Sequence, residues 1–161
     1  MNILNNFSQE LLTLAFAATP VFELRGALPV ALTVYGMSIP KAYLLSVIGN
    51  MLPIFPILLL LEPISNFLRK HFRLFERFFT WLFARTRSKF VTSHEKYGAI
   101  ALIIFIAIPL PATGAWTGAV AAWLFGIKPI RAFFYALAGV AIAGVIVTLL
   151  TLGVSGALNR I

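Results

Sequence analysis

The sequence predicts an all-α integral membrane protein with two inverted repeats, each a re-entrant helical hairpin followed by a long transmembrane helix. Composition is the first observation: of 161 residues, 60% are hydrophobic and only 11% are charged, which is more apolar surface than a soluble domain of this size can bury. The second is length, since Ala42–Leu61 and Ala132–Leu152 are apolar runs of the roughly 20 residues that a spanning helix needs. The third is a proline-broken apolar segment that occurs twice.

The repeat is visible in the positions of prolines and glycines. An offset of 89 residues pairs Pro20 with Pro109 and Pro40 with Pro129. An offset of 90 pairs four further residues of each half: Gly36 with Gly126, Lys41 with Arg131, Ala42 with Ala132, and Gly49 with Gly139. One residue of length difference inside the unit reconciles the two offsets. The shared order and spacing of these pairs predict an internal duplication.

Each repeat contains two apolar arms that are too short to cross a bilayer. The arms are Gln9–Thr19 and Ala27–Met37 in the first repeat, and Gly98–Ile108 and Ala115–Gly126 in the second. A helical arm of this length rises about 17 Å, roughly half a bilayer. Two arms around a Pro/Gly break can therefore form a re-entrant hairpin whose tip lies near the midplane. The alternative is that Ile3–Thr19 crosses the membrane alone, in a tilted orientation.

Basic residues gather between the two halves. The net charge is +8, and eight of the 13 Lys and Arg residues lie in one segment: Arg69, Lys70, Arg73, Arg77, Arg85, Arg87, Lys89 and Lys96. Beside apolar segments, such a cluster fits the positive-inside rule and attraction to anionic lipids, and we expect no nucleic-acid partner. We expect a single membrane domain over residues 1–161, with repeat 1 at 9–64, a cytoplasmic connector at 65–96, repeat 2 at 97–158, and both termini outside.

The connector also carries an apolar stripe. Leu68, Phe72, Phe75, Phe79 and Leu82 recur at three- and four-residue steps between the basic residues. This spacing predicts an amphipathic helix that lies in the membrane interface, with its apolar side toward the lipid and its cations at the headgroups.

Glu23 is the most informative acidic residue. The chain has only five acidic residues, and Glu23 lies at the first break, in FELRG, two residues before Arg25. An ionisable group at membrane depth is costly and faces a cavity or a partner, so Glu23 is a candidate for binding a proton or a substrate headgroup. A Glu that changes its protonation state is what a proton-coupled carrier needs. The other interpretation is an ion pair with Arg25 that only caps the broken helix.

The second break carries no charge. Its candidate site residues are Pro109, Pro111, Thr113, Gly114, Trp116 and Thr117. The prolines remove backbone donors, so carbonyls at this break must find partners in protein or water. The hydroxyls and the N–H groups at the start of the following arm indicate an anion site. Close helix packing through Gly114 and Gly118 is the alternative, and both can hold together.

Lys41 and Arg131 occupy equivalent places at the starts of the two long apolar runs. Each either extends its side chain to the interface or binds a phosphate-bearing headgroup. The chain has no cysteine, no metal-ligand cluster, no nucleophile–His–acid set and no nucleotide-binding loop. The sequence therefore predicts neither an enzyme nor a bound metal or cofactor.

The two break motifs carry a resemblance. FELRGALPVAL and PLPATGAWTGAVAAWLFG resemble the small multidrug export protein family, over most of Thr19–Gly153. The chain is also similar, more distantly, to the DedA and SNARE-associated (VTT) membrane-protein superfamily. That resemblance implies two opposed re-entrant hairpins and a transporter or lipid translocator of the inner membrane. It assigns functional roles to Glu23 in the first hairpin and Arg131 near the second, while the further acidic residues typical of DedA proteins are absent.

Two hypotheses for function follow. The first is a multi-pass inner-membrane transporter that moves an amphipathic substrate, either a lipid phosphate carrier or a small drug. In it, Glu23 and Arg25 bind the proton or headgroup, and the second break shapes the opposite wall. Membrane lipids and this substrate are its partners, and two spanning helices form so thin a scaffold that we expect a homodimer or a larger assembly. The second hypothesis is a non-transporting membrane scaffold or assembly factor.

Overall fold

The computed structural model describes residues 2–71, 95–110 and 113–158, and every regular element in this part of the chain is an α-helix. The helices are α1 (Asn2–Ala18), α2 (Glu23–Thr33), α3 (Ile39–His71), α5 (Glu95–Ala107), α6 (Ala115–Leu124) and α7 (Pro129–Leu158). The predicted all-α class is confirmed for these residues. Two of the helices, α3 and α7, are long and apolar enough to cross a membrane.

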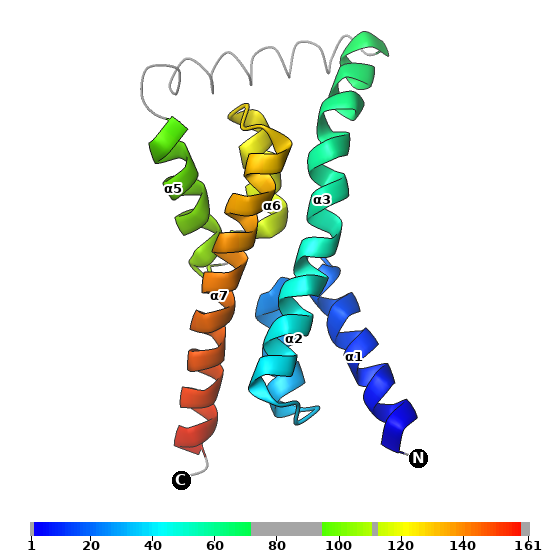
Figure 1. Cartoon of the computed structure of the whole chain (residues 1–161), viewed down its shortest axis with the longest axis vertical. Coiled ribbons are helices and arrows are strands. Elements are labelled where there is room, and N and C mark those ends of the chain that lie inside the picture. Colours follow the sequence, from blue (N-terminus) through cyan, green and yellow to red (C-terminus); the bar gives the residue numbers. More distant parts are fainter. Residues whose placement is uncertain (1, 72–94, 111–112, 159–161) are drawn as a thin grey trace.

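The helices form two groups that approach each other from opposite ends of the molecule (Figure 1). Helix α1 runs from the end that holds the N-terminus to the middle, α2 turns back, and α3 runs the full length. Helix α5 then runs from the far end to the middle, α6 turns back, and α7 returns along the full length. The turn after α1 and the turn after α5 therefore lie near the centre, and α3 and α7 are antiparallel.

Prolines lie at several helix boundaries. Pro20 and Pro109 each lie two residues after the end of a helix, α1 and α5 respectively. Each lacks the N–H that would continue the helix and restricts the residue before it. Pro40 and Pro129 lie instead in the first turns of α3 and α7, where a missing N–H leaves no helical bond unmade.

Two glycines close the short helices α2 and α6. Gly36 has φ 61° and Gly126 has φ 71°, in the left-handed region that glycine adopts readily. Just beyond them, the N–H of Met37 bonds to the carbonyl of Ala31 at 3.0 Å, and that of Ile127 bonds to Ala122 at 2.9 Å. These turns reverse the chain before each long helix starts.

Several helix boundaries differ from those expected. Helix α1 begins at Asn2, so it is longer than the predicted arm, and α2 begins at Glu23, so that residue lies in its first turn rather than in the break. Helix α3 continues to His71, because the change to polar residues after Leu61 ends the apolar span and not the helix. Residues 65–71 thus belong to α3 and 95–96 to α5, while the rest of the predicted amphipathic connector lies outside the described residues.

The core lies where the short helices pack between the two long ones. Its most deeply buried large side chains come from α2, α3, α5 and α7: Leu24, Leu28, Ile54, Ile106 and Val140. Glycines bring helix backbones close together, as is common in membrane proteins. A Cβ on Gly49 would lie 2.5 Å from the carbonyl oxygen of Leu14, so α3 and α1 are in backbone contact there.

The outer surface of the long helices is apolar. Large exposed side chains follow α3 and α7 along their length: Leu44, Ile48, Leu52, Phe55, Leu59, Ile130, Phe134, Ile142, Val145 and Leu149. In the core helix of a soluble protein these residues would be buried. Here most of each apolar span faces outward. Lipid is the surrounding that satisfies such a surface, so the chain is a membrane protein.

Candidate functional site

The candidate site is the contact between the two central turns, here called the turn junction. It consists of Glu23 and Arg25, at the start of α2, together with residues 106–110 and 113–116, which end α5 and begin α6. The sequence analysis selected both sides of this contact separately. The structure brings them together.

Arg25 binds the carbonyl end of α5. Its guanidinium donates to the carbonyl of Leu110, to that of Ile108 at 3.1 Å and to that of Ile106 at 3.3 Å. It also donates to the Thr113 hydroxyl oxygen at 3.2 Å. The last carbonyls of a helix have no helical partners, and Pro109 offers no N–H to replace them. A planar guanidinium with five donors is suited to bind several such oxygens at once.

Glu23 binds the amide end of α6. Its carboxylate accepts a hydrogen bond from the backbone N–H of Trp116 at 3.3 Å, and the amide of Ala115 interacts with it as well. The Glu23 side chain is buried. A carboxylate is favourable at a helix N-terminus because the first N–H groups are unpaired and carry partial positive charge. The anion site predicted at the start of α6 is therefore filled by a side chain of the protein itself.

Glycine at position 114 makes this contact possible. Gly114 is buried, and a Cβ there would overlap the carboxylate of Glu23. Its backbone is extended, so the need for glycine is one of space and not of conformation.

Glu23 itself holds an uncommon backbone conformation. It is the non-glycine residue with positive φ, 48°, among the described residues. For a residue with a Cβ this region is disfavoured, at a cost on the order of 1–3 kcal/mol. A hydrogen bond from its N–H to the carbonyl of Thr19, at 3.1 Å, helps to hold it. Such strain is common where a side chain is positioned for a task.

Glu23 and Arg25 are directed to different partners. In the part of the chain that the structure describes, the ion pair within 4 Å is between Lys41 and Glu10, and no corresponding pair joins Glu23 to Arg25. Instead, the acidic side chain holds the positive end of α6, and the basic one holds the negative end of α5. The two side chains thus bind backbone groups of the second half, while their opposite charges still interact electrostatically over a longer distance.

The remaining residues of the second break lie around this contact. Thr113 places its hydroxyl 2.9 Å from the carbonyl of Ile108, which ties the turn to the end of α5. Thr117 is exposed and bonds to the carbonyl of Gly114 at 3.2 Å. Pro109 is half-buried in the turn, and Pro111 lies outside the described residues. The indole nitrogen of Trp116 is buried and has no hydrogen-bond partner.

Arg131 is not part of the turn junction. It lies exposed in the first turn of α7, whereas Gly144 of the same helix packs against Leu24, next to Glu23. The 13 residues between positions 131 and 144 correspond to about 20 Å of helix. Arg131 thus lies at the helix end, where a membrane headgroup would be.

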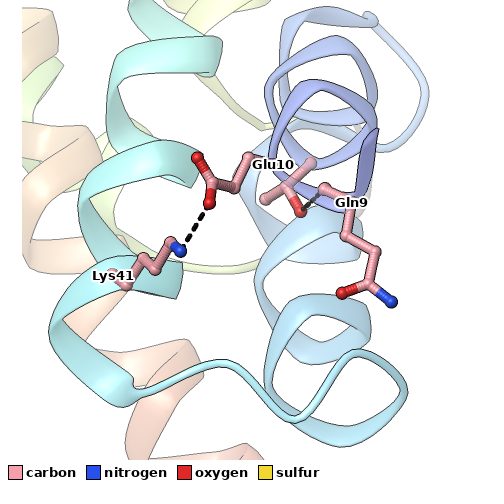
Figure 2. A network of polar contacts seen from close by, with 4 residues as sticks. Gln9, Glu10 and Lys41 are labelled. Carbon is pink, nitrogen blue, oxygen red and sulfur yellow. Dashed lines mark hydrogen bonds and ion pairs between the residues drawn. The ribbon is translucent and has the colours of Figure 1, made fainter. Parts of the chain in front are cut away.

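Lys41, its counterpart in the first half, is paired with a charge (Figure 2). Its Nζ lies 2.5 Å from the Glu10 carboxylate, and both side chains are partly exposed. This ion pair joins α1 to the first turn of α3. Pairing with Glu10 offsets the positive charge of Lys41 at this end of the molecule.

The sequence indicated that carbonyls at the second break need partners, but not that Arg25 supplies the hydrogen bonds to Ile106, Ile108 and Leu110. It also gave no signal for two polar residues of α3. Ser46 and Asn50 of α3 are buried, and neither Ser46 Oγ nor Asn50 Oδ1 has a hydrogen-bond partner. The described residues include no cluster of His, Cys, Asp or Glu that could hold a metal ion.

Comparison with known proteins gives one family. A family model described as "Putative small multi-drug export protein" matches residues 23–146. The match covers more than half of the chain and contains both sides of the turn junction. No curated protein and no solved structure matched the chain.

Proposed function

Because the chain belongs to the small multidrug export protein family, we propose that it exports an amphipathic molecule across the inner membrane and that the turn junction is the gate of the substrate path. One observation carries this proposal. Two charged side chains of the first half hold the two broken helix ends of the second half, Glu23 at α6 and Arg25 at α5. A change of charge or ligation at a single residue can therefore loosen one half from the other.

In the proposed topology, α3 and α7 span the membrane, and the pairs α1–α2 and α5–α6 are re-entrant hairpins that enter from opposite sides. Helix α2 has 11 residues and α6 has 10, so each rises about 15 Å, roughly half a bilayer. Their central meeting in Figure 1 supports this arrangement. Broken backbone at membrane depth is tolerated where protein satisfies it, and Glu23 and Arg25 do so here.

The two units are proposed to be inverted repeats, and matching contacts support this. A Cβ on Gly49 would meet Leu14 and Ala17 of α1, and a Cβ on Gly139 would meet Ile103 and Ile106 of α5. The glycines are 90 positions apart and their neighbours 89, which are the two offsets found between the prolines and glycines of the sequence. Equivalent residues thus pack in the same way in both halves.

Glu23 is the proposed coupling residue. Protonation would remove the charge that α6 attracts and weaken the hold on its first N–H groups. Arg25 stays protonated at all relevant pH values, so α5 remains bound to the first half. Proton binding at Glu23 would therefore open the α6 side of the junction selectively.

Two classes of exported molecule fit the turn junction, and they differ in how they would interact with Glu23. A lipid phosphate would compete with the Glu23 carboxylate for the amides of α6, and Arg25 would attract it. A cationic drug would bind the carboxylate directly. Both are amphipathic, and the apolar outer surfaces of α3 and α7 give either a route from the lipid.

Transport by purified protein in liposomes tests the proposal. The assay follows ethidium and, separately, a fluorescent lipid phosphate, with and without an imposed pH gradient. We expect wild-type protein to move one of the two, and Glu23→Gln to abolish the dependence on the gradient. Glu10→Gln is the control, because it removes a carboxylate of the ion pair with Lys41, away from the junction. If wild type moves neither probe, the export proposal is lost.

A second candidate function is a membrane scaffold that transports nothing. The observation in its favour is that the Glu23 and Arg25 contacts described above are all made within the protein. Under this proposal Glu23→Gln lowers only the thermal stability of the protein in detergent. A transport defect without a loss of stability would exclude it.

Orientation and assembly are proposals with their own test. Single cysteines at Asn2, Ser38, Ser88 and Asn159 can be placed in a chain that has none of its own. The proposed topology expects an impermeant thiol reagent to label positions 2, 38 and 159 from outside and 88 only from inside. Light scattering of the protein in detergent is expected to give a dimer or larger.

A further inference from the structure

Three buried polar atoms lack a hydrogen-bond partner within the described part of the chain: Ser46 Oγ, Asn50 Oδ1 and Trp116 Nε1. Ser46 is 0% exposed and Asn50 is 2% exposed. They lie one turn apart, on the same face of α3. Leaving such groups unsatisfied in an apolar interior is unfavourable, so native proteins rarely do so without a reason.

In this conformation these atoms are not satisfied from outside the folded chain. Because the Ser46 and Asn50 side chains are almost fully covered by their own protein, neither a lipid headgroup nor a second copy of the chain reaches them. Other buried hydroxyls of the protein are satisfied locally, as Thr13 is by the carbonyl of Gln9 at 2.8 Å and Thr148 by Gly144 at 2.7 Å. Ser46 therefore differs from the general pattern of this molecule.

The unsatisfied atoms lie at the depth of the turn junction. Helix α2 has 11 residues, and an equal run of antiparallel α3 from Ile39 ends at Gly49, beside Asn50. Asn50 is thus level with Glu23 at the start of α2. The backbone of Trp116 is at the same level, since its N–H bonds to Glu23. Helix α3 packs against both α2 and α6, so α3 borders the junction.

We propose that Ser46, Asn50 and the Trp116 indole form a polar subsite for the headgroup of the exported molecule. Asn50 Oδ1 supplies an acceptor, Trp116 Nε1 supplies a donor, and the Ser46 hydroxyl can do either, so the subsite takes a group that both donates and accepts hydrogen bonds, such as a hydroxyl or an amide. This proposal rests on the proposed export function. The subsite is closed in this conformation and becomes hydrated when α6 moves away from α3.

Accessibility to a water-soluble reagent tests the subsite without a known substrate. Ser46→Cys and Asn50→Cys, each made alone and placed in nanodiscs, are treated with methanethiosulfonate ethylammonium. Thr13→Cys is the matched control, because Thr13 is 2% exposed, polar and already satisfied. We expect positions 46 and 50 to react about tenfold faster than position 13, because a minor open state hydrates them. Equal rates at all three positions overturn the proposal.

A second pair of variants keeps the subsite testable if the cysteine variants fold poorly. Asn50→Leu removes an unsatisfied polar group, so it should not lower the melting temperature in detergent, whereas its transport of the probe that wild type moves should fall severalfold. Thr13→Val, which removes a satisfied hydroxyl, should leave transport unchanged. Normal transport by Asn50→Leu overturns the subsite. If wild-type protein moves neither probe, the export proposal is overturned instead. The cysteine labelling rates then test by themselves whether the buried polar residues become hydrated.

Discussion

The carboxylate of Glu23 occupies the space that a side chain on Gly114 would need. The two residues come from different halves of the chain, yet neither can be changed without affecting the other. This relationship makes the turn junction testable by substitutions that add or remove a single group.

Gly114→Ala should displace Glu23 from the start of α6. The new methyl group overlaps the carboxylate, so the protein should lose about 1–3 kcal/mol of stability. The measurement is the melting temperature in detergent. Gly98→Ala is the control, because nothing lies within 4 Å of a Cβ at that helical position, and alanine there should raise stability by about 0.5–1 kcal/mol. Equal behaviour of the two variants would contradict the described packing.

Arg25→Lys should weaken the hold on α5 although the charge is kept. An ammonium group cannot reproduce the planar set of bonds to Ile106, Ile108 and Thr113. We expect a loss of about 1.5–3 kcal/mol, the range for hydrogen bonds to charged groups. The melting temperature in detergent should fall accordingly. Lys128→Arg, at the exposed end before α7, should behave as wild type, and an unchanged melting temperature of Arg25→Lys would argue against the role of the guanidinium.

Gly49→Ala and Gly139→Ala should have similar effects. A Cβ would lie 2.5 Å from the Leu14 carbonyl oxygen in the first case and 2.7 Å from the Ile106 Cβ in the second. Both changes force a long helix away from the first short helix of its own half, and each should cost about 1–3 kcal/mol. Gly153→Ala, with nothing within 4 Å of its Cβ, serves as the reference. A large effect at only one of the two glycines would weaken the case for equivalent halves.

The ion pair of Lys41 with Glu10 can be examined by exchanging its charges. Glu10→Lys and Lys41→Glu alone each place like charges together, and the double variant restores an opposite pair. Both side chains are partly exposed, so the coupling free energy in a double-mutant cycle should be small, about 0.2–1 kcal/mol. Additive effects of the two single changes would show that the contact contributes nothing.

The sequence was sufficient to predict those features of the structure that depend on local chemistry. Pro20 and Pro109 indicated the central turns, because a proline lacks the N–H that a continuing helix needs. This signal is not sufficient alone, since Pro29 lies within α2 and Pro53, Pro56 and Pro63 lie within α3. Glu23 was identifiable as a residue that needs a partner, because a carboxyl group inside an apolar segment is costly without one. The lengths of α1 and α3 could not be predicted from hydropathy, because a helix can continue where apolar residues give way to polar ones.

The partners of these residues could not be read from the sequence. Arg25 lies two positions from Glu23, so pairing between them was the nearest interpretation, but tertiary packing gives each a backbone partner more than eighty residues away. Ser46 and Asn50 could not be identified from the sequence because they lie within a long apolar run. Their significance depends on burial and on missing hydrogen bonds, and both are properties of the folded chain.

The two halves of the chain contribute different chemical groups to the turn junction, and this difference has an evolutionary consequence. The second half contributes main-chain groups: the carbonyls that receive Arg25 and the amide that meets Glu23. Every amino acid carries such a carbonyl, so the exposed residues Ile108 and Leu110 can change in identity without breaking the link, whereas Ile106 is also constrained by its buried side chain. The two charged positions of the first half have no comparable freedom, and mutational tolerance should be higher at positions 108 and 110 than at positions 23 and 25.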